Sequence, residues 1–83
     1  MGEVTIKFWG RLSDLAGSDI THPLAEPISV EDFRQVLADK YADGDVATFQ
    51  KSIRAIINDS LVGEEAVIQS GDVIEFLPPV GGG

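Results

Sequence analysis

The sequence has no cysteine and only one histidine, His22, among its 83 residues. The absence of cysteine excludes disulfides, thiolate metal sites and a cysteine nucleophile. Because the serines have no base available beyond that single histidine, a hydrolase triad is excluded as well. No apolar run is long enough to span a bilayer, and the first twenty residues lack the charged-then-apolar layout of a signal peptide. We therefore expect a cytoplasmic protein that does not enter membranes.

Positive charge is also scarce, with 6 basic residues against 14 acidic ones and a net charge of −8. Such a surface repels nucleic acid, whereas a protein with a basic docking face would attract it. Alternatively, the excess charge only keeps a small domain soluble. The two carboxylates in Asp43-Gly44-Asp45 are too few for calcium. We expect no metal site and no cofactor bound by the chain itself.

Among the residues that are present, apolar and polar side chains alternate over residues 4–9, which predicts a strand. Residues 11–16 then predict a short helical turn, closed by Gly17 as a left-handed cap. Residues 19–24 predict a weaker strand, and its Pro23 fits only a sheet edge. In the first strand, Val4, Ile6 and Phe8 are expected to point inward, and Thr5, Lys7 and Trp9 outward.

The clearest local signal is a helix start at Ser29, with Asp32 at the capping-box position and Ile28 and Phe33 spaced for a hydrophobic staple. The helix is predicted to run to about Tyr41 and to be ended by residues 43–45. Residues 46–52 are compatible with one more helical turn. Helical spacing assigns Val30, Phe33, Val36, Leu37 and Tyr41 to the buried face, and Glu31, Arg34, Gln35 and Asp39 mostly to the solvated face.

A third strand is predicted over residues 53–57, and a turn at residues 58–59 joins it to a short strand over residues 60–62. A short crossing over residues 64–68 and a turn at residues 70–72 then lead into the last strand. Alternation in that strand places Ile74 and Phe76 in the core, faces Glu75 to water and leaves Val73 and Leu77 outside.

This order of elements predicts an α+β domain over residues 1–77, with a mixed sheet packed on one main helix in the ubiquitin-like β-grasp arrangement. The first and last strands of that arrangement lie side by side at the centre of the sheet. A flexible C-terminal Gly-Gly tail over residues 78–83 would leave a central strand and have a firmly held root.

Two prolines and three glycines follow close on that last strand. One interpretation is an ordinary disordered terminus. The other is that the carboxylate of Gly83 is the reactive group, carried into other proteins' active sites on an arm slender enough to pass a narrow channel. The stiff Pro-Pro root favours this second interpretation. The arm consists of Pro78, Pro79, Val80, Gly81, Gly82 and Gly83.

A second candidate site lies on the sheet face that the helix is not expected to cover. The predicted alternation gathers four apolar side chains there, and an exposed apolar patch often marks a docking surface. Alternatively, residues 47–52 cover part of it, or the strand register differs by one residue. This docking patch consists of Trp9, Ile56, Val73 and Leu77.

Five stretches carry a family resemblance: Phe76-x-Pro-Pro-Val-x-Gly-Gly, Arg11-Leu12-x-x-Leu15-Ala16-Gly17, the helix start at Ser29-Val30, Ile56-Ile57-Asn58 and Gly71-Asp72-x-Ile74. Together they resemble the small subunit of molybdopterin synthase, the MoaD-type sulfur carriers, over essentially the whole chain. Pro-Pro-Val before the glycines is the most specific part. The triple glycine is also seen in the thiamin-pathway sulfur carrier ThiS, although ThiS-like chains are usually shorter and lack the Pro-Pro.

The resemblance implies a reaction cycle for a chain with no independent active site. A MoeB-like adenylating enzyme would use ATP and magnesium to convert Gly83 into an acyl-adenylate, and a sulfurtransferase would help to turn it into a thiocarboxylate. The charged carrier would dock on a MoaE-like large subunit, in a heterotetramer of two small and two large subunits. It would thread residues 80–83 into that subunit and give its sulfur to cyclic pyranopterin monophosphate.

Two other classes of function remain open. The chain could be a sulfur carrier of another pathway, such as thiamin, or a ubiquitin-like modifier that forms isopeptide bonds with lysines. It could also be a β-grasp binding module without covalent chemistry, in which case the last two glycines would be dispensable.

Overall fold

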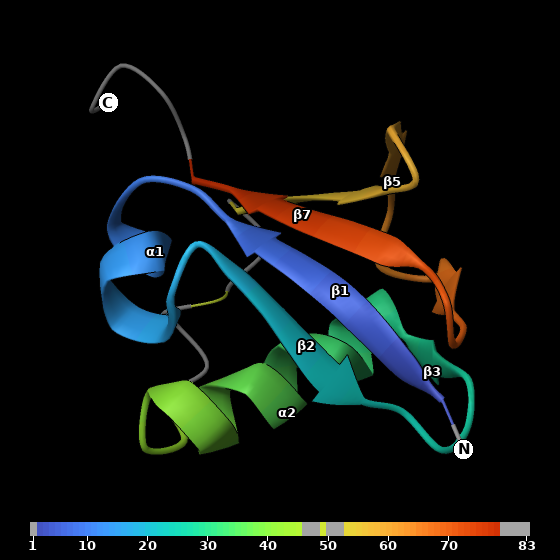
Figure 1. The fold of residues 1–83 in the computed structure, drawn as a ribbon, viewed down its shortest axis with the longest axis horizontal. Coiled ribbons are helices and arrows are strands. Elements are labelled where there is room, and N and C mark those ends of the chain that lie inside the picture. Colours follow the sequence, from blue (N-terminus) through green and yellow to red (C-terminus); the bar gives the residue numbers. More distant parts are fainter. Residues whose placement is uncertain (1, 46–48, 50–52, 79–83) are drawn as a thin grey trace.

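The computed structural model describes residues 2–45, 49 and 53–78 (Figure 1). One long helix lies beneath a five-stranded sheet, and neither helix within these ranges has the length and apolar character needed to cross a bilayer. The elements are β1 (Glu3–Phe8), α1 (Arg11–Ala16), β2 (Asp19–Pro23), β3 (Ile28–Ser29), α2 (Val30–Tyr41), β4 (Arg54–Ile57), β5 (Ser60–Val62), β6 (Val67–Ile68) and β7 (Val73–Leu77).

The strands of the large sheet follow the order β2-β1-β7-β4-β5. β1 and β7 run parallel, with Ile6 beside Ile74 and Phe8 beside Phe76, whereas the other pairs in this sheet are antiparallel. The predicted mixed sheet with its first and last strands paired at the centre is therefore confirmed. β2, which ends at Pro23, lies at an edge as predicted.

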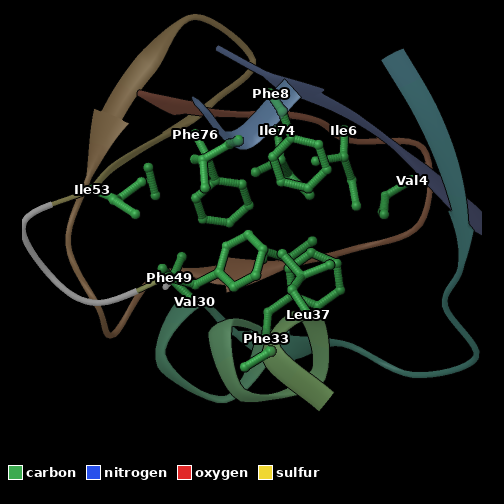
Figure 2. Close-up of a cluster of buried hydrophobic side chains, with 14 of the residues drawn as sticks. Val4, Ile6, Phe8, Val30, Phe33, Leu37, Phe49, Ile53, Ile74 and Phe76 are labelled. Atoms are coloured by element: carbon green, nitrogen blue, oxygen red, sulfur yellow. The ribbon is translucent and has the colours of Figure 1, made fainter. Parts of the chain in front are cut away.

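The core lies between the inner face of this sheet and α2 (Figure 2). Alternation in β1 and β7 turns Ile6, Ile74 and Phe76 toward the helix, and all three are completely buried. Each such side chain stabilises the fold by about 1.5–3 kcal/mol relative to an exposed position. On the other side, α2 contributes Val30, Phe33, Leu37 and Ala38.

The start and end of α2 follow the sequence signals. The hydroxyl oxygen of Ser29 accepts a hydrogen bond from the backbone N–H of Asp32 at 3.1 Å, which satisfies one of the free donors of the first turn. At the other end, Asp43 and Gly44 have φ angles of 52° and 84°. These left-handed conformations stop the helix where the prediction placed its end.

Arg34 is buried, which corrects the prediction that it lies on the solvated face of α2. Its side chain is 5% exposed, and its guanidinium donates to both carboxylate oxygens of Glu64 at 2.7 and 2.8 Å. It also donates to the backbone carbonyl oxygens of Phe49 and Ile53 at 2.9 and 2.7 Å. Because these acceptors compensate for the lost water, the buried cation is tolerated. Arg34 thereby ties α2 to two later segments of the chain.

Three smaller features also differ from the prediction or lie beyond it. β3 and β6 pair as a second, two-stranded sheet that the sequence pattern did not indicate. Gly17 has a φ of 97°, which favours glycine, but its ψ of 157° is not that of the predicted left-handed cap. The helical turn considered for residues 46–52 lies outside the described residues except for Phe49, which is fully buried.

Candidate functional site

The root of the predicted arm is the carboxyl end of β7, the middle strand of the sheet. β1 and β4 flank this strand and pair Phe76 with Phe8 and Ala55, and Leu77 with Arg54. The ring of Phe76 is completely buried and stacks on that of Phe8 with centroids 5.9 Å apart. β7 is therefore held along both edges and from the core side as far as Phe76.

The end of β7 lies beside the corner between β1 and α1 (Figure 1), and Pro78, which follows β7, packs against this corner. Gly10 forms this corner with a φ of 61°, and a Cβ atom placed on it would lie 3.0 Å from Cγ of Pro78. Next to it, the backbone N–H of Trp9 donates to the carbonyl oxygen of Phe76 at 3.3 Å. Because glycine has no side chain, the proline ring can approach the corner closely. The first residue of the arm is thus in contact with the folded domain.

The rest of the arm, Pro79, Val80, Gly81, Gly82 and Gly83, lies outside the described residues. Its entry into a partner's active site and the reactivity of Gly83 therefore stay predictions. The same holds for the division into a domain over residues 1–77 and a tail over residues 78–83.

The four residues of the predicted docking patch lie on the sheet face opposite to α2. On β7, Val73 and Leu77 alternate with the buried core residues, and on β4 Ile56 follows a buried alanine. Trp9 comes directly after β1 and is 50% exposed, whereas the other three side chains are half-buried. The structure thus places the four residues on a common face, and their role in binding stays a prediction.

Glu75 lies at the centre of the docking patch. It stands between Val73 and Leu77 on β7 and opposite Ile56 on β4. The indole Nε1–H of Trp9 donates to Oε1 of Glu75 at 3.1 Å. The patch is therefore a set of apolar side chains around one carboxylate, as the alternation of β7 predicted, whereas the hydrogen bond from Trp9 was not predicted.

Leu61 extends the apolar face beyond the docking patch and was missed in the sequence. It is 61% exposed and stands opposite Ile56 in the β4–β5 hairpin. The length of the turn could have indicated this position from the sequence. Asn58 and Asp59 form a two-residue turn with φ angles of 48° and 72°. Such a turn pairs residue 57 with 60 and residue 56 with 61, which puts Leu61 on the same face as Ile56.

His22 is part of the structural interior. Its ring packs edge-on against Phe33 with centroids 5.5 Å apart, and Nδ1 lies 2.7 Å from the carbonyl oxygen of Pro23. Burial lowers the pKa of His22 below its ordinary value of 6.5, so the neutral ring is favoured. Among the described residues, no three acidic or histidine side chains are placed to hold a metal ion.

A mixed sheet with β1 and β7 parallel at its centre and one long helix across it defines a ubiquitin-like β-grasp protein. The solution structure of small archaeal modifier protein 1 from Methanosarcina acetivorans matches this chain with a TM-score of 0.75 at 29% identity, covering 100% of this chain and 98% of that one. A chain of the protein–protein complex of subunits 1 and 2 of molybdopterin-converting factor from Helicobacter pylori 26695 matches with a TM-score of 0.61 at 22% identity, covering 98% and 99%.

Within that class, the chain belongs to the ThiS family, whose model matches residues 6–83. The molybdopterin synthase sulfur carrier subunit of Escherichia coli (strain K12) is 30% identical over 80 residues, covering 96% of this chain and 99% of that protein. The resemblance to sulfur carriers that the sequence motifs indicated is confirmed by these two matches.

Proposed function

We propose that this chain is the sulfur-carrier subunit of a molybdopterin synthase and that Gly83 holds the sulfur as a thiocarboxylate. Membership of the ThiS family and the 30% identity to a molybdopterin synthase sulfur carrier subunit support the proposal. The observation that carries it is the position of the arm's root. Pro78 follows directly on β7, the middle strand, in which Phe76 is buried, and it packs against the β1–α1 corner. A fixed root restricts where a short arm can reach, which favours delivery of its end to one site.

The proposed chemistry begins at the carboxylate of Gly83. In an adenylating enzyme of the MoeB kind, with ATP and magnesium, a carboxylate oxygen attacks the α-phosphate and pyrophosphate leaves. The resulting acyl-adenylate has AMP as a good leaving group. A sulfur nucleophile delivered by a sulfurtransferase attacks the carbonyl carbon, and AMP departs. Because the chain has no cysteine, the carboxyl end is the group that can hold transferable sulfur.

The partner in the second half of the cycle is a MoaE-like large subunit. A related structure is a complex of subunits 1 and 2 of molybdopterin-converting factor, which supports a pairing of this kind. The net charge of −8 favours a partner with a basic docking face. Residues 79–83 span at most roughly 17 Å when extended, which is enough to enter a pocket beside the docking patch. There the sulfur passes to cyclic pyranopterin monophosphate, in a cytoplasmic heterotetramer of two small and two large subunits.

Mass-spectrometric mapping of the carboxyl end tests the proposal directly. The protein is incubated with the adenylating enzyme of its own source, ATP and a sulfur donor, and is then treated with a thiol-alkylating reagent. We expect an adduct confined to Gly83 that forms only with ATP. Peptide mapping is required because oxidation of Met1 adds nearly the same mass as exchange of oxygen for sulfur. If no adduct forms under conditions in which the Escherichia coli carrier reacts, the proposal is wrong.

Protein modification is the second candidate function, and the 29% identity to small archaeal modifier protein 1 favours it. In that case a lysine amine, rather than sulfur, displaces AMP from Gly83 and forms an isopeptide bond. A third use, sulfur transfer in the thiamin pathway, is compatible with the triple glycine. The thiocarboxylate form, mixed with the large subunit and cyclic pyranopterin monophosphate, separates these functions. Formation of molybdopterin supports the first, and protein adducts that resist reducing agents support the modifier.

A further inference from the structure

Glu75 is the one charged residue of β7, the middle strand of the sheet. Its neighbours on the outer face are Val73 and Leu77 along the strand and Ile56 across it on β4. α2 lies against the opposite face of the sheet (Figure 2). A protein that docks on the apolar side chains of this face must therefore also cover the carboxylate.

Within the described residues, Glu75 has one side-chain hydrogen bond and no ion pair. Trp9 donates one hydrogen bond from its indole Nε1–H to Oε1 at 3.1 Å. Lys7 is the neighbour of Glu75 on β1, and Arg54 lies beside Leu77 on β4. Both basic side chains are exposed, and neither forms an ion pair with Glu75 in the part of the chain that the structure describes. The carboxylate thus depends on water for most of its solvation.

Covering such a carboxylate with a purely apolar partner removes that water without replacing it, which is costly. A partner that places a cation beside the carboxylate compensates for the lost hydration. Arginine fits best, because its planar guanidinium can bind both carboxylate oxygens and can also stack on an aromatic ring. Trp9 offers such a ring, since it is 50% exposed and already contacts the carboxylate of Glu75.

We propose that Glu75, oriented by Trp9, binds an arginine at the centre of the docking face of the large subunit and thereby selects this partner. The inference rests on the proposed function, since it names the chemistry of the large subunit's side of the contact. Trp9 acts as a positioning residue, because its hydrogen bond fixes the carboxylate, and in the complex the surrounding apolar side chains exclude water. A protein whose docking face is apolar but has no arginine at this point is not bound.

Calorimetric titration of the full-length chain with the large subunit from the same source tests the inference. Glu75→Gln keeps an acceptor for Trp9 and the shape of the side chain but removes the charge. We expect its Kd to rise about tenfold or more, and Glu75→Lys to abolish measurable binding. The matched control is Glu26→Gln, which removes the same charge from an exposed loop residue and should leave the Kd unchanged. The unfolding midpoint of each variant is measured as a control for folding. Trp9→Phe, which lacks the indole donor, is a second test and should weaken binding by a smaller factor than Glu75→Gln.

Charge exchange between the two proteins identifies the contact. An Arg→Glu substitution on the docking face of the large subunit should restore binding of Glu75→Lys, because the two charges are then exchanged. If the wild-type chain binds and Glu75→Gln binds equally well, the inference is wrong while the proposed function stands. If the wild-type chain does not bind the large subunit at all, the proposed function fails and the inference fails with it.

Discussion

The two faces of β7 differ in what their side chains contact. Ile74 and Phe76 point into the core and are completely buried, whereas Val73, Glu75 and Leu77 lie on the opposite face and are half-buried. The inner residues determine where the strand lies, and with it the root of the arm. The outer residues belong to the predicted docking patch beside that root. Because the two sets are interleaved in one strand, substitutions one residue apart should change different properties of the protein.

Deletion of Gly82-Gly83 should give the largest effect, since it leaves both faces of β7 intact and removes the proposed reactive group. We expect sulfur transfer to be abolished, because no carboxylate then reaches the active site of either enzyme. The melting curve should match that of the full-length chain. An assay of molybdopterin formation with the large subunit, together with thermal unfolding, measures both quantities. Loss of the folded state on deletion would contradict the assignment of these residues to an arm outside the core.

Substitution on the inner face should have the largest effect on stability. Phe76→Ala removes a completely buried ring that contacts those of Phe8 and Phe49, with centroids 5.9 and 6.4 Å away. We expect the free energy of unfolding to fall by about 3–5 kcal/mol. Denaturant titration measures the change, and Leu77→Ala, one residue further on the outer face, is the control that should cost clearly less. Equal losses for the two variants would show that the faces of β7 are not distinct.

Two neighbouring isoleucines of β4 allow the same comparison between the outer and the inner face of the sheet. Ile56 lies in the docking patch, whereas Ile57 packs against the core cluster. We expect Ile56→Ala to weaken binding of the large subunit by about tenfold and to leave the unfolding midpoint nearly unchanged. Ile57→Ala should lower the free energy of unfolding by about 2 kcal/mol and leave the Kd unchanged. The reverse pattern would place the docking surface on another face.

We expect the smallest effect for His22 on β2, whose burial makes the stability of the fold depend on pH. Burial lowers the pKa of His22 in the folded protein below 6.5, so the unfolded chain binds the proton first as the pH falls. The contribution of the neutral ring to stability is therefore complete above about pH 6.5 and is lost progressively below it. Stability measured between pH 7.5 and 5 should fall more for the wild type than for His22→Gln. Parallel curves would show that His22 titrates normally.

The residues with period-two alternation were predictable from the sequence because their environment is set by local geometry. The inward positions of Val4, Ile6 and Phe8 in β1, and of Ile74 and Phe76 in β7, follow from the side-chain period of a strand. The cap at Ser29 is equally local, since its acceptor and donor are three residues apart. The motif Pro-Pro-Val before the glycines then indicated the family.

The misassigned position of Arg34 has a different cause. Its acceptors come from residues 49, 53 and 64, and helical periodicity contains no information on partners so distant in the sequence. A charged residue on a helix is ordinarily assigned to the solvent-exposed face. Only the tertiary structure shows the carboxylate and the two backbone carbonyl oxygens that accept hydrogen bonds from Arg34. β3 and β6 were missed because two residues are too few to show alternation.

The parallel pairing of β1 with β7 also bears on how the protein folds. These are the first and last strands of the domain, so their ladder closes one of the longest loops in the chain and forms only at a high cost in chain entropy. Trp9, which follows β1, and Glu75, which belongs to β7, meet only after that closure. A partly unfolded chain therefore lacks both a directed arm and a complete recognition surface. Partner binding would thus select chains in which β1 and β7 are already paired, because only these present the complete surface.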